Sequence, residues 1–459
     1  MVLALVAAVV SSVLVSPSGR AAAQPSSSPK VDCVDVQPDA AKASAMLATC
    51  ARPVEILSER TEYSQTFLNP DGSRTLEQGI EPVRVRKGSS WAPVDTTLKP
   101  ADGGYAPRAS VLPMVFSAGG SGPFARLRDG DRELAMSWPE RLPAPELDGS
   151  SLVYREVLPA TDLRVTATAL GFSEVLVVGT REAAQNPKLA ELRFGLTTKN
   201  LEVVPAAGGG LTARDKAGEA IFAAPAPVMW DSSAEAGQQD SPAAGAKDAP
   251  DPTAQRKTEK AETEVAAEKP ALAPADPVHR AVMPLRVEGE QLTIVPDRKM
   301  LADDRTKFPV FIDPSWTGGI ASNAWTSVWS KHKTSSFWQN ASALQGGSTS
   351  GSAGAGRTED CNGCADYVVR SLFRMNTSTV RGKHILDAKF RIEQRHAWTC
   401  SPKSNAKLWL TGAISSGTTW NNQPTWDSSR TAQTAANRKR GAAHGCAGTE
   451  RSSSTLRRW

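Results

Sequence analysis

Long apolar runs, histidine and catalytic signatures are scarce in this 459-residue chain. No run approaches the roughly 20 apolar residues that a membrane helix needs, so we expect no membrane span once an N-terminal leader is removed. There are five His residues and no G-x-S-x-G, H-E-x-x-H or Walker sequence, the signatures of several hydrolases, zinc proteases and nucleotide-binding loops. The sequence therefore predicts a protein that is not an enzyme and uses no cofactor.

Excess charge is confined to one end of the chain. The formal net charge is +5, from 53 basic and 48 acidic residues. Residues 427–459 hold seven Lys or Arg and two acids, so residues 1–426 carry 46 charges of each sign. A body without net charge has no long-range field to attract a polyanion. We therefore expect no nucleic-acid partner.

The first 23 residues carry an export pattern. An apolar segment over residues 2–15 is followed by Pro17 and Gly19, and three alanines precede Gln24. A short apolar core with a small-residue cleavage site is typical of a secretory signal, although a basic n-region is missing and suggests a start codon further upstream. We predict cleavage before Gln24 and a secreted, extracellular or cell-wall-associated protein.

Cysteine is rare, and its even count of six suggests structural disulfides in an exported protein. Cys33 and Cys50 flank an alanine-rich segment and could close a small loop. The C-x-x-C of Cys361 and Cys364 is also compatible with half a zinc site, with His396 and Cys400 as further ligands, or with a redox pair. No second C-x-x-C follows, so we favour disulfides and predict no metal site. The disulfide candidates are Cys33, Cys50, Cys361, Cys364 and Cys400, and Cys446 is the sixth cysteine.

Strand-like segments alternate with turns from residue 52 to 230, after an N-terminal segment at 24–51. Apolar and polar residues alternate over 163–169, and Asp129-Gly130 separates the two halves of a hairpin within 126–136. Turn signals recur at the spacing of about 8–12 residues that is typical of β-sandwiches. We predict a mainly β fold whose first domain is a β-rich sandwich or meander, with a short helix at 181–189.

Composition changes sharply at residues 231–280, which are rich in Ala, Pro, Glu, Lys and Asp and nearly without large apolar residues. Such a stretch cannot form a core, and we predict a disordered linker. Strand-like segments resume at 283–287, 291–295 and 310–312. We expect residues 281–314 to complete the first domain.

Four sequence blocks between residues 371 and 424 carry a family pattern: SLFRM, ILDAKFR, LW and TTWNNQP. In order and spacing they resemble the DNRLRE-type modules of secreted bacterial proteins, some of which are classed as carbohydrate-binding. The resemblance implies a jelly-roll β-sandwich over 315–426, and the loss of strand pattern after residue 426 predicts that it is incomplete. Its structural signature residues are Phe373, Arg374, Trp409, Trp420, Asn421 and Pro424. The whole chain is similar to the N-terminal part of actinobacterial secreted proteins with laminin-G-like or Rhs-repeat regions.

Tryptophan is concentrated in the last 145 residues, which hold nine of the twelve. A flat indole binds the C–H face of a sugar by excluding water. Trp325, Trp329 and Trp338, near Asn323 and Asn340, are therefore candidate ligand residues. The alternative is that these tryptophans fill the core of the module.

These observations leave three interpretations of function. We predict a non-catalytic protein that binds glycan or cell-wall polysaccharide. The alternative is a structural or delivery segment of a larger surface or toxin protein, with no ligand of its own. A glycosidase would need two positioned carboxylates, and acids are few in residues 315–426. The sequence does not predict an oligomeric state.

Residues 427–459 break the strand pattern, with Leu456 and Trp459 as their only large apolar residues. We therefore expect the module to lack closing strands, and we predict a frameshift near Trp426 in a truncated gene. Relatives continue with a strand resembling Val-Glu-Phe-Asp-Ala, which encoded as GTC GAG TTC GAC GCC would give the Ser-Ser-Ser-Thr of 452–455 in another frame. The alternative is a genuine basic tail that binds anionic wall polymer.

Overall fold

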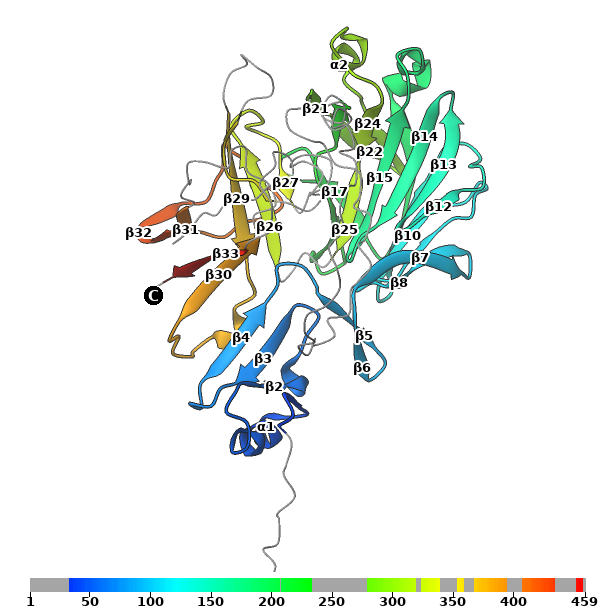
Figure 1. Cartoon of the computed structure of the whole chain (residues 1–459). Helices are drawn as coiled ribbons and strands as arrows, with labels where there is room; N and C mark the ends of the chain where they lie inside the picture. The colour runs from blue at the N-terminus through cyan, green and yellow to red at the C-terminus, as the bar shows by residue number, and fades with distance from the viewer. Residues whose placement is uncertain are drawn as a thin grey trace, which may run out of the picture. The chain divides into compact units, whose positions relative to one another are not determined.

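A computed structural model shows a mainly β protein, as the sequence predicts (Figure 1). Its strands form seven sheets within the part of the chain that the structure describes. The predicted signal segment and most of the predicted linker lie outside that part. The described residues are 33–206, 208–232, 279–318, 323–338, 353–358, 367–393, 407–433 and 451–456.

The chain divides into two compact units. The first comprises Met1–Arg60 with Gln65–Leu76, and the second comprises Thr61–Ser64 with Glu77–Trp459. The boundary expected at residue 52 therefore lies inside the first unit. The physical reason is that strands on both sides of residue 52 pair in one sheet.

In the smaller unit, helix α1 (Ala40–Leu47) packs on a four-stranded sheet. Asp39 caps the helix by accepting a hydrogen bond from the backbone N–H of Lys42 at 2.9 Å, which satisfies one of its unpaired N–H groups. The core consists of Ala43, Cys50, Val54 and Ile56. The other elements are β1 (Val36–Gln37), β2 (Val54–Ile56), η1 (Leu57–Glu59), β3 (Ser64–Leu68) and β4 (Arg74–Gln78).

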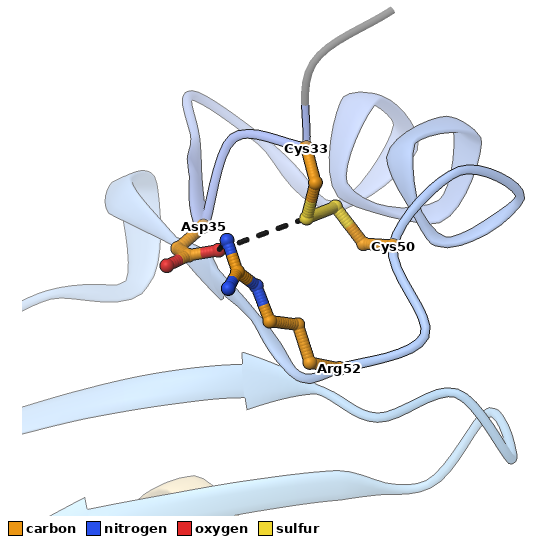
Figure 2. The surroundings of a disulfide bond; sticks show 4 residues. All are labelled: Cys33, Asp35, Cys50 and Arg52. Carbon is orange, nitrogen blue, oxygen red and sulfur yellow. Dashed lines mark hydrogen bonds and ion pairs between the residues drawn. A yellow bond between two sulfur atoms is a disulfide. The ribbon is translucent and has the colours of Figure 1, made fainter.

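A disulfide between Cys33 and Cys50 closes the segment that contains α1 (Figure 2). Their Cα atoms are 5.2 Å apart, within the usual range for a disulfide. Asp35 and Arg52 form an ion pair at 2.6 Å beside it. The loop that the sequence suggested for Cys33 and Cys50 is therefore present. The remaining candidates, which are Cys361, Cys364 and Cys400, lie outside the described residues, as does the sixth cysteine, Cys446.

Two large sheets form the first β-domain of the larger unit, and a separate hairpin precedes them. The hairpin pairs β5 (Arg84–Lys87) with β6 (Ser90–Pro93). The eight-stranded sheet has the order β22 (Leu285–Glu288), β23 (Gln291–Ile294), β16 (Leu192–Lys199), β11 (Arg132–Ser137), β10 (Ala125–Asp129), β9 (Met114–Phe116), β8 (Gly104–Ala109) and β7 (Asp95–Ala101).

The second sheet has eleven strands. Its main path is β12 (Glu146–Asp148), β13 (Ser151–Leu158), β14 (Thr161–Ala167), β15 (Gly171–Val178), β25 (Ser315–Gly318), β19 (Ala220–Ala224), β18 (Leu211–Arg214) and β17 (Glu202–Pro205). The remaining strands are β20 (Val228–Asp231), β21 (Arg280–Val282) and β24 (Val310–Asp313), and β24 pairs with both β15 and β20.

Alternating apolar residues build one core between these two sheets. Phe172 and Leu176 of β15 lie in it, with Leu163 of β14, because successive side chains of a strand point to opposite faces. Phe116 of the eight-stranded sheet meets Phe172 edge to face, with ring centroids 6.0 Å apart. The first β-domain is therefore a two-sheet sandwich.

Local sequence signals are reproduced in this domain. Asp129 pairs with Arg132 across the β10–β11 turn, and Gly130 has a φ of +61°, the left-handed conformation that favours glycine. The short helix expected at 181–189 is present as two 3₁₀ turns, η2 (Ala183–Gln185) and η3 (Pro187–Ala190).

The strands after the linker return to the first β-domain. β22 and β23 extend the eight-stranded sheet, and β21 and β24 join the eleven-stranded one. β25 also pairs with β15 and β19, so this domain extends to residue 318 rather than 314. The helix α2 (Arg298–Ala302) lies between β23 and β24 in the sequence.

In the described residues the C-terminal module begins at β26. A four-stranded sheet has the order β27 (Phe337–Trp338), β26 (Ala324–Trp329), β29 (Tyr367–Arg374) and β28 (Gly356–Thr358), and η5 (Ser378–Val380) follows β29. Two further pairs are β30 (Ala388–Glu393) with β33 (Arg451–Leu456), and β31 (Lys407–Thr411) with β32 (Trp426–Gln433). Parts of the predicted tail are therefore paired strands, and within the ILDAKFR block the strand begins at Ala388.

Candidate functional site

The three predicted ligand tryptophans are buried. Trp325 is 4% exposed, Trp329 1% and Trp338 3%. Trp329 stacks on Tyr367 with centroids 5.5 Å apart, and its Nε1 donates a hydrogen bond to Oγ of Ser327 at 3.0 Å. An indole enclosed in this way presents no ring face to a sugar. The core alternative therefore describes these three positions.

Trp325 and Trp329 belong to a core to which the module and the first β-domain both contribute. We call it the shared core. Its first-domain members are Val175, Val228, Trp230 and Phe311, and its module members are Trp325, Trp329, Phe337, Tyr367 and Val369. The aromatic residues of the module sheet thus hold it against the eleven-stranded sheet.

Strand β29 places its side chains alternately on two sides. Phe373 packs against the shared core and stacks on Trp325. Arg374 faces the other way and lies over the ring of Trp338, 5.3 Å from its centroid, and its Nη1 donates a hydrogen bond to the carbonyl of Ile414 at 3.4 Å. Burial lowers the pKa of Arg374, and the cation–π contact offsets part of the cost of burying its charge.

The TTWNNQP segment is a loop fastened by its own side chains. Oδ1 of Asn422 accepts hydrogen bonds from the N–H and the hydroxyl of Thr419, and its Nδ2 donates to the carbonyl of Gly417 at 2.8 Å. The exposed Asn421 donates its N–H to the carbonyl of Lys333. These contacts explain why the segment needs side-chain amides and hydroxyls, and they fix the loop that carries Trp420.

Arg370, which is not among the predicted site residues, contacts two tryptophans of this region. Its guanidinium carbon lies 4.6 Å from the ring centroid of Trp420 and 4.5 Å from that of Trp426. Its Nη1 donates a hydrogen bond to Oε1 of Gln423 at 2.9 Å, and Nε2 of Gln423 donates to the carbonyl of Trp420 at 2.8 Å. Burial lowers the pKa of Arg370. The cation–π contacts, each worth about 0.5–2 kcal/mol, hold both rings in place.

Beside Trp426 lies an open hollow of about 440 Å³. Trp426 is 40% exposed as a residue, and its ring meets that of Trp409 of β31 at 5.6 Å between centroids, with the ring planes at 61°. The register of β31 against β32 shifts between Trp409 and Leu410, and such a bulge re-aims side chains. Leu410 is 43% exposed. We call this site the Trp426 hollow, and its lining is Leu410, Thr411, Gly412, Thr425, Trp426 and Asp427.

The structure brings some of the predicted signature residues together and separates others. Trp409 contacts the ring of Trp426, and Trp420 contacts Arg370, which also lies over Trp426, so both tryptophans lie near the Trp426 hollow. Pro424 directly precedes Thr425, which lines the hollow. Phe373 and Arg374 have packing roles away from it. Sequence alternation offered one signal for Arg370, since it lies four residues before Arg374 on the same strand and so on the same face.

Two further observations concern only the part of the chain that the structure describes. It holds no group of three or more His, Cys, Asp or Glu side chains arranged to bind a metal ion. Each of its helices is too short or too polar to cross a membrane.

Comparison of the chain with known protein families, with curated proteins and with solved structures gives no match. The candidate site therefore stands on its own geometry.

Proposed function

We propose that this chain is a non-catalytic glycan-binding protein of the cell exterior that contacts polysaccharide through the Trp426 hollow. The observation that carries the proposal is the exposed ring of Trp426, held by Arg370 next to an open hollow with hydroxyl and carboxylate groups on its lining. The DNRLRE-type resemblance of the surrounding segment points to the same class of ligand.

The lining suits a sugar ring. Trp426 and Leu410 supply exposed apolar area for the C–H face of a pyranose, and burying that face against an aromatic ring is favourable. Thr411, Thr425 and Asp427 supply oxygens that can orient sugar hydroxyls. The ring of Trp426 is positioned before a ligand arrives, so less conformational entropy is lost on binding.

A binding role is favoured over hydrolysis by the number of carboxylates. Glycosidases use two carboxyl groups about 5–10 Å apart on either side of the scissile bond. Asp427 is the one carboxylate among the described residues that line the hollow. A ligand would therefore be held there without being cleaved.

Export is part of the proposal. The disulfide between Cys33 and Cys50 is of the kind that forms and persists in oxidising compartments, and an apolar leader precedes it in the sequence. N-terminal sequencing of protein recovered from the culture medium should give Gln24. Recovery of material that still begins at Met1 would contradict this part of the proposal.

A structural role is the second candidate, and one observation favours it. The shared core joins the module to the first β-domain through large aromatic side chains, as a rigid spacer or shell would require. On that interpretation Trp426 would be an incidental surface residue, and no polysaccharide would be retained.

Co-sedimentation with insoluble polysaccharides and with purified cell wall tests the proposal. We expect the wild-type chain to sediment with at least one of these materials and Trp426→Ala to lose at least about 90% of that binding. The matched control is Trp91→Ala in the β5–β6 hairpin, a partly exposed tryptophan whose ring centroid lies 5.3 Å from the guanidinium carbon of Arg86. Equal retention of both variants, or no retention of the wild type, would contradict glycan binding through the Trp426 hollow.

A further inference from the structure

The guanidinium of Arg370 occupies one side of the ring of Trp426. Its carbon lies 4.5 Å from the centroid of that ring and 4.6 Å from the centroid of Trp420. A cation over an indole is attracted by the negative face of the ring. Trp426 is nevertheless 40% exposed, so a ligand reaches its ring from the side that Arg370 does not cover.

Arg370 is carried by a strand that is paired on both sides. Strand β29 lies between β26 and β28, and Arg370 is in register with Val328 of β26. A side chain on a paired strand starts from a more precise position than one on a loop. The long side chain itself keeps several rotatable bonds, and ordering them costs conformational entropy. The position of the guanidinium therefore depends on what binds the end of the side chain.

Gln423 binds that end. Its Oε1 accepts a hydrogen bond from Nη1 of Arg370 at 2.9 Å, and its Nε2 donates to the carbonyl of Trp420 at 2.8 Å. A primary amide can make both bonds because it carries an acceptor and two donors, whereas an ionised carboxylate only accepts. Gln423 is thereby fastened to the backbone of its own loop and to the guanidinium at once.

The loop that contains Gln423 is anchored on the module. The backbone N–H of Asn421 donates to the carbonyl of Lys333 at 3.0 Å. A continuous series of contacts therefore leads from this anchored loop, through Gln423 and Arg370, to the ring of Trp426.

We infer that Gln423 is a positioning residue for glycan binding: through Arg370 it holds the indole of Trp426 with one side against the guanidinium and the other side open to the ligand. The inference rests on the proposed glycan binding and assigns a role to the glutamine of the TTWNNQP segment. A ring that is held before the ligand arrives loses less conformational entropy on binding. It also admits a sugar on one side only.

Isothermal titration with soluble hexasaccharides measures the effect on binding. The probes are cellohexaose, chitohexaose and maltohexaose, and we expect at least one of them to bind the wild-type chain. Gln423→Met keeps the length of the side chain and removes both hydrogen bonds, and it should weaken that binding at least about fivefold. Arg370→Met should weaken it at least about tenfold. The matched control is Arg86→Met, which removes the guanidinium over Trp91 in the β5–β6 hairpin and should keep wild-type affinity.

The position of the ring can be measured without a ligand. Fluorine-labelled tryptophan gives a separate NMR resonance for each ring, and Trp426→Phe identifies the resonance of Trp426. We expect Gln423→Met to shift or broaden that resonance, while the resonance of Trp138, which is buried in the first β-domain, and the midpoint of thermal unfolding stay close to those of the wild type. A purely structural role of Gln423 would not single out the ring of Trp426.

A double variant tests whether Gln423 acts through Arg370. If it does, Gln423→Met adds little once Arg370 is replaced, and the double variant binds within about twofold of Arg370→Met alone. Losses of affinity that simply add would overturn the positioning role. If Arg370→Met does not fold, the affinity and the Trp426 resonance of Gln423→Met decide the question.

The outcomes separate the positioning role from the binding itself. Wild-type affinity or an unchanged Trp426 resonance in a folded Gln423→Met variant would overturn the positioning role and leave glycan binding in place. Wild-type affinity in Trp426→Ala, or the absence of binding to every hexasaccharide and insoluble polysaccharide, would overturn the proposed function and the positioning role with it.

Discussion

Glu174 is a fully buried carboxyl group in the sandwich of the first β-domain. It is 0% exposed, and neither carboxyl oxygen has a hydrogen-bond partner among the described residues. Its neighbours two positions away, Phe172 and Leu176, are core residues, so strand alternation points Glu174 at the same core. Burial, and then the charge of Asp313, raises the pKa of Glu174 well above its ordinary value of 4.5.

This pKa shift predicts a pH dependence of stability. As the pH rises above 4.5, the unfolded chain releases the proton of Glu174 while the folded chain keeps it. The free energy of unfolding should therefore fall as the pH rises, with a contribution of up to about 1.4 kcal/mol per pH unit until the folded-state pKa is reached. We expect Glu174→Gln to remove this contribution and to stabilise the protein at pH 8.

Urea unfolding followed by circular dichroism between pH 5 and pH 8 measures the slope. The matched control is Glu202→Gln, at an exposed position of the short strand β17, which should keep the wild-type slope. The prediction fails if Glu174→Gln and the wild type show the same dependence on pH.

Tryptophans of the C-terminal half differ in what their removal should do. Trp329, 1% exposed in the shared core, leaves a large cavity when truncated. We expect Trp329→Ala to reduce the free energy of unfolding by about 3–5 kcal/mol, whereas Trp426→Ala at a 40% exposed position should cost less than about 1.5 kcal/mol. Chemical denaturation of the two variants tests this order, and equal losses would contradict the assignment of core and surface.

At the scale of elements, the end of β20 and the start of β21 lie next to each other, although a long segment of the chain separates them in the sequence. Trp230 pairs with Arg280, and the N–H of Asp231 donates to the carbonyl of His279 at 3.0 Å. A buried carboxylate oxygen of Asp231 also accepts from the N–H of Lys307 at 3.0 Å. The base of this insertion is therefore closed by bonds that do not depend on the inserted residues.

We accordingly expect replacement of residues 233–278 by a Gly-Ser-Gly turn to leave the fold intact. Loop-closure entropy changes slowly with loop length, so the midpoint of thermal unfolding should change by no more than about 5 °C. In contrast, Asp231→Ala should cost about 1–3 kcal/mol, because it removes a side chain that is 1% exposed and accepts a hydrogen bond from the N–H of Lys307. A large loss of stability in the shortened chain, measured by thermal melting, would show that the inserted residues take part in the core.

Elements that depend on local signals could be predicted from the sequence, and those that depend on distant pairing could not. The β10–β11 hairpin follows from Asp129-Gly130, and β14 follows from alternation over neighbouring residues. The position of β25 between β15 and β19 joins residues far apart in the chain, and no local pattern specifies it.

The same difference between local signals and distant contacts explains which residues of the candidate site could be predicted from the sequence. Sequence composition identified a tryptophan-rich region, but the exposure of each ring depends on which elements cover it. Trp325, Trp329 and Trp338 are covered by packed sheets, whereas Trp426 is partly open. Arg370 was missed because its role arises from two rings that lie more than 45 residues further along the chain.

At the scale of the whole chain, the shared core makes the module dependent on the first β-domain. Four of its buried members come from that domain, namely Val175, Val228, Trp230 and Phe311. Without them, a fragment of residues 319–459 would expose the aromatic side chains that pack on them, and exposed patches of this kind cause association.

We therefore expect the fragment 319–459 to bind a hydrophobic dye such as ANS and to aggregate, while the chain of residues 33–459 does neither at the same concentration. Dye fluorescence and size-exclusion chromatography measure the difference. A monomeric fragment that unfolds cooperatively and binds no dye would show that the module is stable without the shared core.

Recognition of glycan by the Trp426 hollow is tested most directly by isothermal titration of the folded chain with a soluble oligosaccharide from a polymer that it sediments with. We predict that Trp426→Ala weakens binding at least tenfold, about 1.4 kcal/mol, while its thermal unfolding stays close to that of the wild type and Trp91→Ala keeps wild-type affinity. Wild-type affinity in a folded Trp426→Ala variant would contradict the assignment of the site.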